Sequence, residues 1–112
     1  MPEAPTAPDV SLDELARALE RGEPLALLDV READEFDAAH VPGARSLPLS
    51  ALESASARDA LAPLGDLGEL GEGARVVTFC AAGSRALRAR DALTRLGLPG
   101  ARAAAGGMLE WL

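Results

Sequence analysis

The chain of 112 residues has little of the residue types on which several protein classes depend. It contains one cysteine, Cys80, one histidine, His40, and no lysine, so all 11 basic residues are arginine. A single cysteine excludes an internal disulfide, a dithiol redox motif and a cysteine-based zinc site, which needs several Cys or His ligands. We therefore expect no structural metal, and any cysteine chemistry rests on one thiol.

Positive charge and aromatic side chains are also scarce. The 18 acidic residues outnumber the 11 basic ones, which gives a net charge of −7, and aromatic residues make up 3% of the chain. Binding to a phosphate backbone depends on clustered positive charge, and binding to single strands depends on aromatic stacking platforms. We therefore expect no nucleic-acid partner.

Long apolar runs are missing as well. The longest stretches, such as Leu25 to Leu28, have the length of a strand, whereas a membrane helix needs about 20 apolar residues. The first ten residues carry acid and three prolines, where a signal peptide has a basic start and an apolar stretch. We expect a soluble, cytoplasmic protein with no membrane partner.

Hydrophobic spacing predicts a flexible tail over residues 1–9 and one domain over residues 10–112. Strands alternate with helices in that domain, which predicts an α/β fold with a mostly parallel sheet and helices on both faces. The predicted strands cover 25–30, 44–49, 75–79 and a short segment after 101. The predicted helices cover 11–21, 32–40, 50–64 with Ser50 as its cap, 85–96 and a last turn at Trp111; a surface loop covers 65–73, and Gly106-Gly107 is read as a turn.

Polar residues follow two of the predicted strands. Asp29 and Arg31 come at the end of one strand, and Cys80 comes at the end of another. Parallel sheets bind ligands at the carboxyl ends of their strands. Asp29 and Arg31 suit a structural ion pair better than direct chemistry.

A six-residue loop, Cys80-Ala81-Ala82-Gly83-Ser84-Arg85, joins the apolar strand to a helix. Backbone N–H groups in such a loop and the positive end of the helix favour an anion and stabilise a thiolate. Gly83 allows a positive φ or a close backbone approach. Arg85 adds a permanent positive charge with a two-pronged donor. The loop therefore predicts Cys80 as a nucleophile.

Each of these residues also allows a role without chemistry. A free cysteine is often a small buried hydrophobe, and Arg85 alone suits a surface position on a helix. Ser84 can donate to an anion or cap the helix. His40 can serve as a base for Cys80, although a packing or capping role is more common.

Three motifs in order resemble the signatures of single-domain rhodanese-like sulfurtransferases. They are D-V-R, E-x-x-E-F and H-x-P-G-A within residues 27–49, the C-x-x-G-x-R loop within 76–97, and G-G-x-x-x-W over 106–111. The resemblance covers about residues 10–112 and implies a central parallel sheet of five strands. It implies that Cys80 carries a persulfide, that the loop residues Ala81, Ala82, Gly83, Ser84 and Arg85 bind the substrate sulfur, and that Asp29 and Arg31 are structural residues near the site. We expect His40 to be a structural residue near the site as well.

The implied activity moves a sulfane sulfur from thiosulfate or a persulfide to cyanide or a thiol, without metal or cofactor. The implied partners are small sulfur-containing anions or thiols and a sulfur-donor or sulfur-acceptor protein. The loop positions Ala81, Ala82 and Ser84 are uncharged, although efficient thiosulfate enzymes often carry cations there. Glu35 stands where two-domain thiosulfate enzymes have an arginine. A glutathione persulfide, a protein persulfide or a desulfurase is an equally compatible donor.

Two other functions are open at this point. The chain could be a binding or redox-sensing module that uses Cys80 without turnover. A phosphatase or arsenate reductase of the related fold is less compatible, because those enzymes resemble C-x5-R and this chain has C-x4-R from Cys80 to Arg85.

Overall fold

The computed structural model describes residues 10–23, 25–54, 75–96 and 101–111. The predicted tail over 1–9, the surface loop over 65–73 and most of the predicted helix over 50–64 lie outside the described residues.

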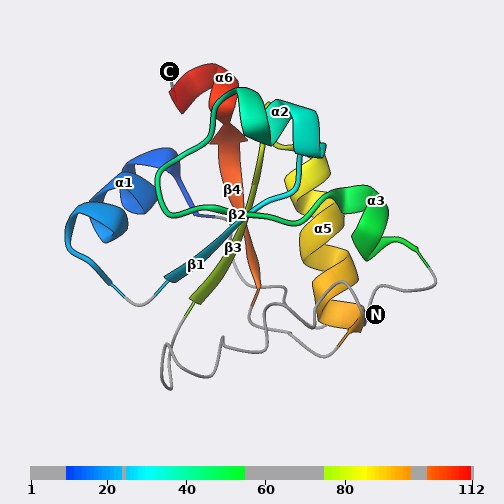
Figure 1. The fold of residues 1–112 in the computed structure, drawn as a ribbon. Helices are drawn as coiled ribbons and strands as arrows, with labels where there is room; N and C mark the ends of the chain where they lie inside the picture. The colour runs from blue at the N-terminus through cyan, green and yellow to red at the C-terminus, as the bar shows by residue number, and fades with distance from the viewer. Residues whose placement is uncertain (1–9, 24, 55–74, 97–100, 112) are drawn as a thin grey trace.

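The described residues form one sheet of four parallel strands (Figure 1). The strand order is β2-β1-β3-β4, and the strands are β1 (Leu25–Asp29), β2 (Arg45–Ser46), β3 (Arg75–Cys80) and β4 (Arg102–Gly107). The expected number of five is one too many for this part of the chain. Val10 takes the fifth place with a single parallel bridge to Ala104, and the strand stops there because Ser11 already caps the first helix.

Helices cover both faces of the sheet, as predicted (Figure 1). The chain forms α1 (Leu12–Glu20), α2 (Ala33–Ala38), α3 (Leu49–Leu52), α5 (Ser84–Arg95) and α6 (Met108–Trp111). Helices α3 and α5 pack on one face, and α1 and α6 pack on the other. The ring of Trp111 meets the ring of Phe79 edge-on, with centroids 5.8 Å apart.

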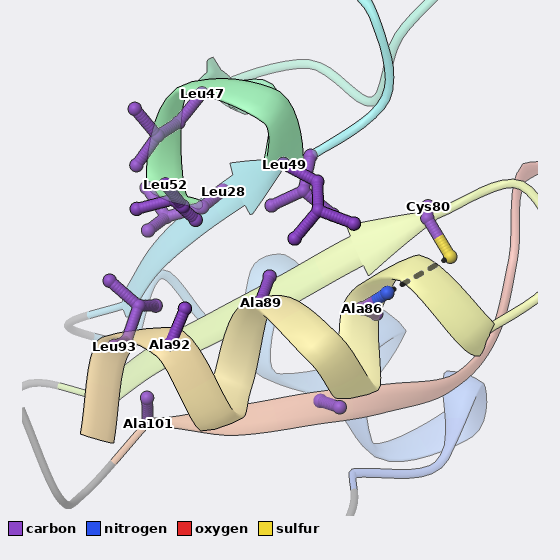
Figure 2. Packing of buried hydrophobic residues seen from close by; sticks show 12 residues of the cluster. Leu28, Leu47, Leu49, Leu52, Cys80, Ala86, Ala89, Ala92, Leu93 and Ala101 are labelled. Carbon is purple, nitrogen blue, oxygen red and sulfur yellow. Dashed lines mark hydrogen bonds between the residues drawn. The ribbon is translucent and has the colours of Figure 1, made fainter. Parts of the chain in front are cut away.

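Small side chains let α5 lie close to the sheet. Figure 2 shows Ala86, Ala89 and Ala92 in a row on the helix face that meets β3 and the leucines of α3. All three alanines are buried. An alanine face brings the helix backbone near the strands, which places the first turn of α5 against the end of β3.

Two helix caps differ from the predictions. Helix α3 begins at Leu49 after Pro48, so Ser50 lies inside the helix and is not its cap. Helix α5 begins at Ser84 and its N-cap is Gly83, so the capping role considered for Ser84 is wrong. In both places the N-cap lies one or two residues before the serine that was considered as the cap.

The strand register brings the two polar segments to one edge of the sheet. Asp29 pairs with Phe79 in the β1–β3 ladder, and the Val30 N–H donates to the Phe79 carbonyl at 2.8 Å. The residues after β1 and the last residue of β3 are therefore neighbours.

Candidate active site

Cys80 is the last residue of β3, and backbone N–H groups point at its sulfur. The Gly83 N–H donates to Sγ at 3.0 Å and the Ala86 N–H donates at 3.3 Å, as the dashed line in Figure 2 shows for Ala86. The side chain is 1% exposed. Successive backbone N–H groups of this kind are the donors found in anion-binding loops.

Gly83 gives the loop its tight turn. Its φ of +113° is a backbone conformation that residues with a side chain rarely adopt. The turn lets the loop double back so that the Gly83 N–H reaches the sulfur three residues earlier.

Thr78, which the sequence did not single out, fixes the first turn of α5. Its side chain is fully buried, and its hydroxyl donates to the Ala86 carbonyl at 2.7 Å. The same residue, Ala86, donates its N–H to the sulfur. A buried hydroxyl thus holds one of the two donors in place.

The end of β4 supports the loop from behind. Gly107 pairs with Cys80 in the β3–β4 ladder, and a Cβ at Gly107 would collide with the Cys80 carbonyl oxygen. The Leu109 N–H donates to the Ala81 carbonyl at 3.1 Å. The expected turn at Gly106-Gly107 is wrong, because both glycines end β4 and the close backbone contact requires Gly107.

A hollow of about 330 Å³ lies against the loop. Its lining residues come from the loop, from α5 and from β4: Ala82, Gly83, Ser84, Leu87, Ala104, Ala105 and Gly106. Three of the five residues predicted to bind substrate therefore line a space that can hold a small anion or a thiol.

Arg85 does not stand free at the end of the loop. Its guanidinium makes a two-pronged pair with the carboxylate of Glu35, at 2.7 Å and 3.1 Å. The hydrogen bonds from Arg85 and the backbone N–H of Glu32 lower the pKa of Glu35 to about 2. The same hydrogen bond raises the pKa of Arg85, so both groups keep their charge at neutral pH.

Asp29 and Arg31 form a buried ion pair beside the loop. The Arg31 Nη2 lies 2.8 Å from the Asp29 Oδ2, and the two side chains are 7% and 0% exposed. Arg31 also donates to the Ala39 carbonyl at 2.6 Å. The hydrogen bond to Asp29 raises the pKa of Arg31. The pair ties the end of β1 to the segment after α2.

His40 contacts Phe36, which lies four residues earlier in the chain. Its ring stacks on Phe36 with centroids 3.8 Å apart, and its Nδ1 lies 2.9 Å from the Phe36 carbonyl. This exposed side chain is held by packing, and the geometry gives no support to a role as base for Cys80.

The described residues hold neither a candidate metal site nor a candidate membrane-spanning helix. They contain no group of three or more His, Cys, Asp or Glu side chains that could hold a metal ion. None of the helices in this part of the chain has the length and apolar character needed to cross a bilayer.

A known protein family matches almost the whole chain. The sequence model of that family, which is described as the rhodanese-like domain, matches residues 11–112. The chain belongs to the rhodanese-like family. A human protein named thiosulfate:glutathione sulfurtransferase is 40% identical over 110 residues, which span 95% of this chain and 94% of that protein. The solved structure of the human single-domain sulfurtransferase TSTD1 superimposes with a TM-score of 0.73 at 37% identity, over 94% of this chain and 95% of that one.

The rhodanese-like domain also occurs within longer proteins. The maize adenylyltransferase and sulfurtransferase MOCS3-1 is 33% identical over 108 residues, which span 96% of this chain and 22% of that protein. The human relatives of similar length are named as sulfurtransferases, and this chain spans about a fifth of the longer maize protein.

Within this rhodanese-like site, the partner of Arg85 is a residue that the sequence does not indicate. Glu35 stands out in the sequence only for its difference from the two-domain enzymes. It precedes Arg85 by 50 residues, and no local pattern indicates that pair. The available signal was topological: both residues lie in the first turn of a helix that starts at the carboxyl edge of the sheet.

Proposed function

We propose that this rhodanese-like protein transfers a sulfane sulfur through a persulfide on Cys80. The observation that carries the proposal is the pair of backbone N–H groups, from Gly83 and Ala86, directed at the buried sulfur. Preorganised donors of this kind stabilise charge where a reaction develops it. Ala81, Ala82, Gly83, Ser84 and Arg85 are proposed to surround the transferred sulfur.

The reaction runs in two displacements. The Cys80 thiolate attacks the outer sulfur of thiosulfate, so that a new S–S bond forms at Sγ while the S–S bond of the donor breaks and its electron pair leaves with sulfite. An acceptor thiolate then attacks the outer sulfur of the persulfide. The electron pair of the broken bond returns to Sγ, which regenerates the thiolate and releases a persulfide product.

The proposed donor is thiosulfate or a low-molecular-weight persulfide, and the proposed acceptor is a thiol such as glutathione, or cyanide. The human relative with 40% identity bears both thiosulfate and glutathione in its name, and it supports this choice. The hollow against the loop is a suitable place for the acceptor. A cytoplasmic location stays a prediction, which cell fractionation tests.

The human relative, which is 40% identical over nearly its whole length and is named as a sulfurtransferase, favours a transferase over a redox sensor. The burial of Cys80 does not separate the two functions, because limited access to a thiol that is 1% exposed hinders a sulfur donor as much as an oxidant. The six-residue loop is shorter than the one we expect for a phosphatase.

A donor and acceptor panel tests the function. Thiosulfate and glutathione persulfide are each combined with cyanide, glutathione and dithiothreitol, and sulfite or thiocyanate release is measured. We expect turnover with at least one pair, lost in Cys80→Ser. Oxidation of Cys80 by peroxide without turnover on any pair would support the sensor instead, and hydrolysis of a phosphate monoester that depends on Cys80 would support a phosphatase.

A further inference from the structure

The Glu35–Arg85 pair lies at the rim of the Cys80 loop. It joins the first turn of α2 to the first turn of α5, and the side chains are 36% and 31% exposed. Both oxygens of the carboxylate and both terminal nitrogens of the guanidinium take part. The pair is therefore partly buried and joined by two hydrogen bonds, unlike a single contact between exposed side chains.

The pair decides the charge that a donor meets. Arg85 is the only charged residue in the loop from Cys80 to Arg85. A second cation at this edge, Arg31, is bound to Asp29. Glu32, at the start of α2, also acts on Arg85 with its negative charge. With Glu35 in place, the loop has no uncompensated positive charge.

We propose that Glu35 is a specificity-determining residue. By pairing with Arg85 it cancels the positive charge of the loop, and it thereby lowers kcat/KM for doubly charged donors such as thiosulfate relative to singly charged donors. The inference rests on the proposed function. Glu35 acts through Arg85 and does not touch the reacting sulfur, so it is a positioning residue.

Two donors that differ by one charge isolate this effect. Thiosulfate is a dianion that leaves as sulfite, and methanethiosulfonate is a monoanion that leaves as methanesulfinate. In each case the Cys80 thiolate forms a bond to the terminal sulfur, and the S–S bond of the donor breaks with its electron pair on the leaving group. The interaction of a fixed charge with a donor scales with the charge of that donor.

The test variant is Glu35→Gln, which removes the charge and keeps an amide oxygen for the hydrogen bond that Glu35 accepts from the Glu32 N–H. We expect kcat/KM to rise about fivefold with thiosulfate and about twofold with methanethiosulfonate. Persulfide formation on Cys80 is measured by mass spectrometry in the same samples. The ratio of the two kcat/KM values is the quantity that decides.

The matched control is Glu53→Gln. Glu53 pairs with Arg88 of helix α5 at 2.6 Å, so this variant changes the net charge equally and breaks a more exposed pair on the helix that carries Arg85. For this control we expect the same ratio of kcat/KM with thiosulfate to kcat/KM with methanethiosulfonate as in the wild type. A shift equal to that of Glu35→Gln would overturn the proposal, because net charge alone would then explain the effect.

A second variant, Glu35→Asp, separates charge from geometry. It keeps the negative charge near Arg85 and shortens the side chain, so we expect a ratio close to wild type. An equal shift in Glu35→Asp and Glu35→Gln, or no shift in either while Cys80 still loads, overturns the inference and leaves the proposed function standing. Failure of the wild type to load Cys80 from either donor overturns both.

Discussion

At the scale of single residues, the environment of Cys80 depends on backbone groups and on buried polar side chains around them. The N–H groups of Gly83 and Ala86 point at the sulfur, and Thr78 holds the turn that contains Ala86. The side chains of Ala81 and Ala82 add no charge to the loop. The place of Cys80 at the end of β3 and the tight turn at Gly83 could be predicted from the sequence, because a glycine three residues after a cysteine is a local pattern.

The buried ion pair between Asp29 and Arg31 makes a stability prediction. Asp29→Asn leaves the Arg31 charge buried without its anion, although Arg31 keeps its bond to the Ala39 carbonyl. Removing one partner of a buried pair costs about 3–5 kcal/mol. We expect urea unfolding to show a loss of about 3 kcal/mol. The control Glu53→Gln breaks an exposed pair and should lower the free energy of unfolding by less than about 1 kcal/mol. Equal losses in the two variants would show that burial of the ion pair does not determine the cost of breaking it.

At the scale of elements, the loop is held between β3, α5 and β4. The two strands with apolar and β-branched sequences, β1 and β3, end within one residue of their predicted ends. The predicted strand over 44–49 is reduced to the two residues of β2, because Pro48 lacks an N–H and the chain enters α3. The contact between β4 and the loop could not be predicted, since it joins segments that are distant in the sequence.

Gly107 makes a prediction for this support. Gly107→Ala forces a Cβ onto the Cys80 carbonyl, so the loop backbone must move. Overpacking of this kind costs about 1–3 kcal/mol, and we expect persulfide loading of Cys80 to slow markedly as well. Urea unfolding and the rate of loading are measured on the same preparation.

The control for Gly107 is Gly43→Ala. Gly43 has a φ of +87° and no atom within 4 Å of an added Cβ, so that variant should cost about 1–2 kcal/mol through backbone strain alone. Its loading rate should equal that of the wild type. If Gly107→Ala loaded Cys80 as fast as Gly43→Ala does, the proposed support of the loop by β4 would be wrong.

At the scale of the whole molecule, a chain with a net charge of −7 has a candidate anion site, among the residues that the structure describes, at the edge of a parallel sheet. The fold class and the family could be predicted because the three motifs are ordered along the chain. The charge state of the site could not, because it depends on the Glu35–Arg85 contact across 50 residues. That contact makes the site less cationic than the loop sequence alone indicates.

The net charge predicts how salt affects loading. Raising the ionic strength from about 0.01 M to about 0.15 M shortens the screening length from roughly 30 Å to roughly 8 Å. Repulsion between the protein and a dianion then weakens, so the second-order rate of loading from thiosulfate should rise about two- to fivefold, and that from methanethiosulfonate should rise less. Stopped-flow or quenched mass spectrometry measures both rates. A rate that falls with salt would show that the site attracts anions.

The most direct test of the account is the mass of the intact protein after treatment with thiosulfate or glutathione persulfide, followed by peptide mapping. The account predicts the added mass of one sulfur atom, located on Cys80, which disappears when a thiol acceptor is added and never appears in Cys80→Ser. A wild-type protein whose Cys80 gains no sulfur from either donor would contradict it.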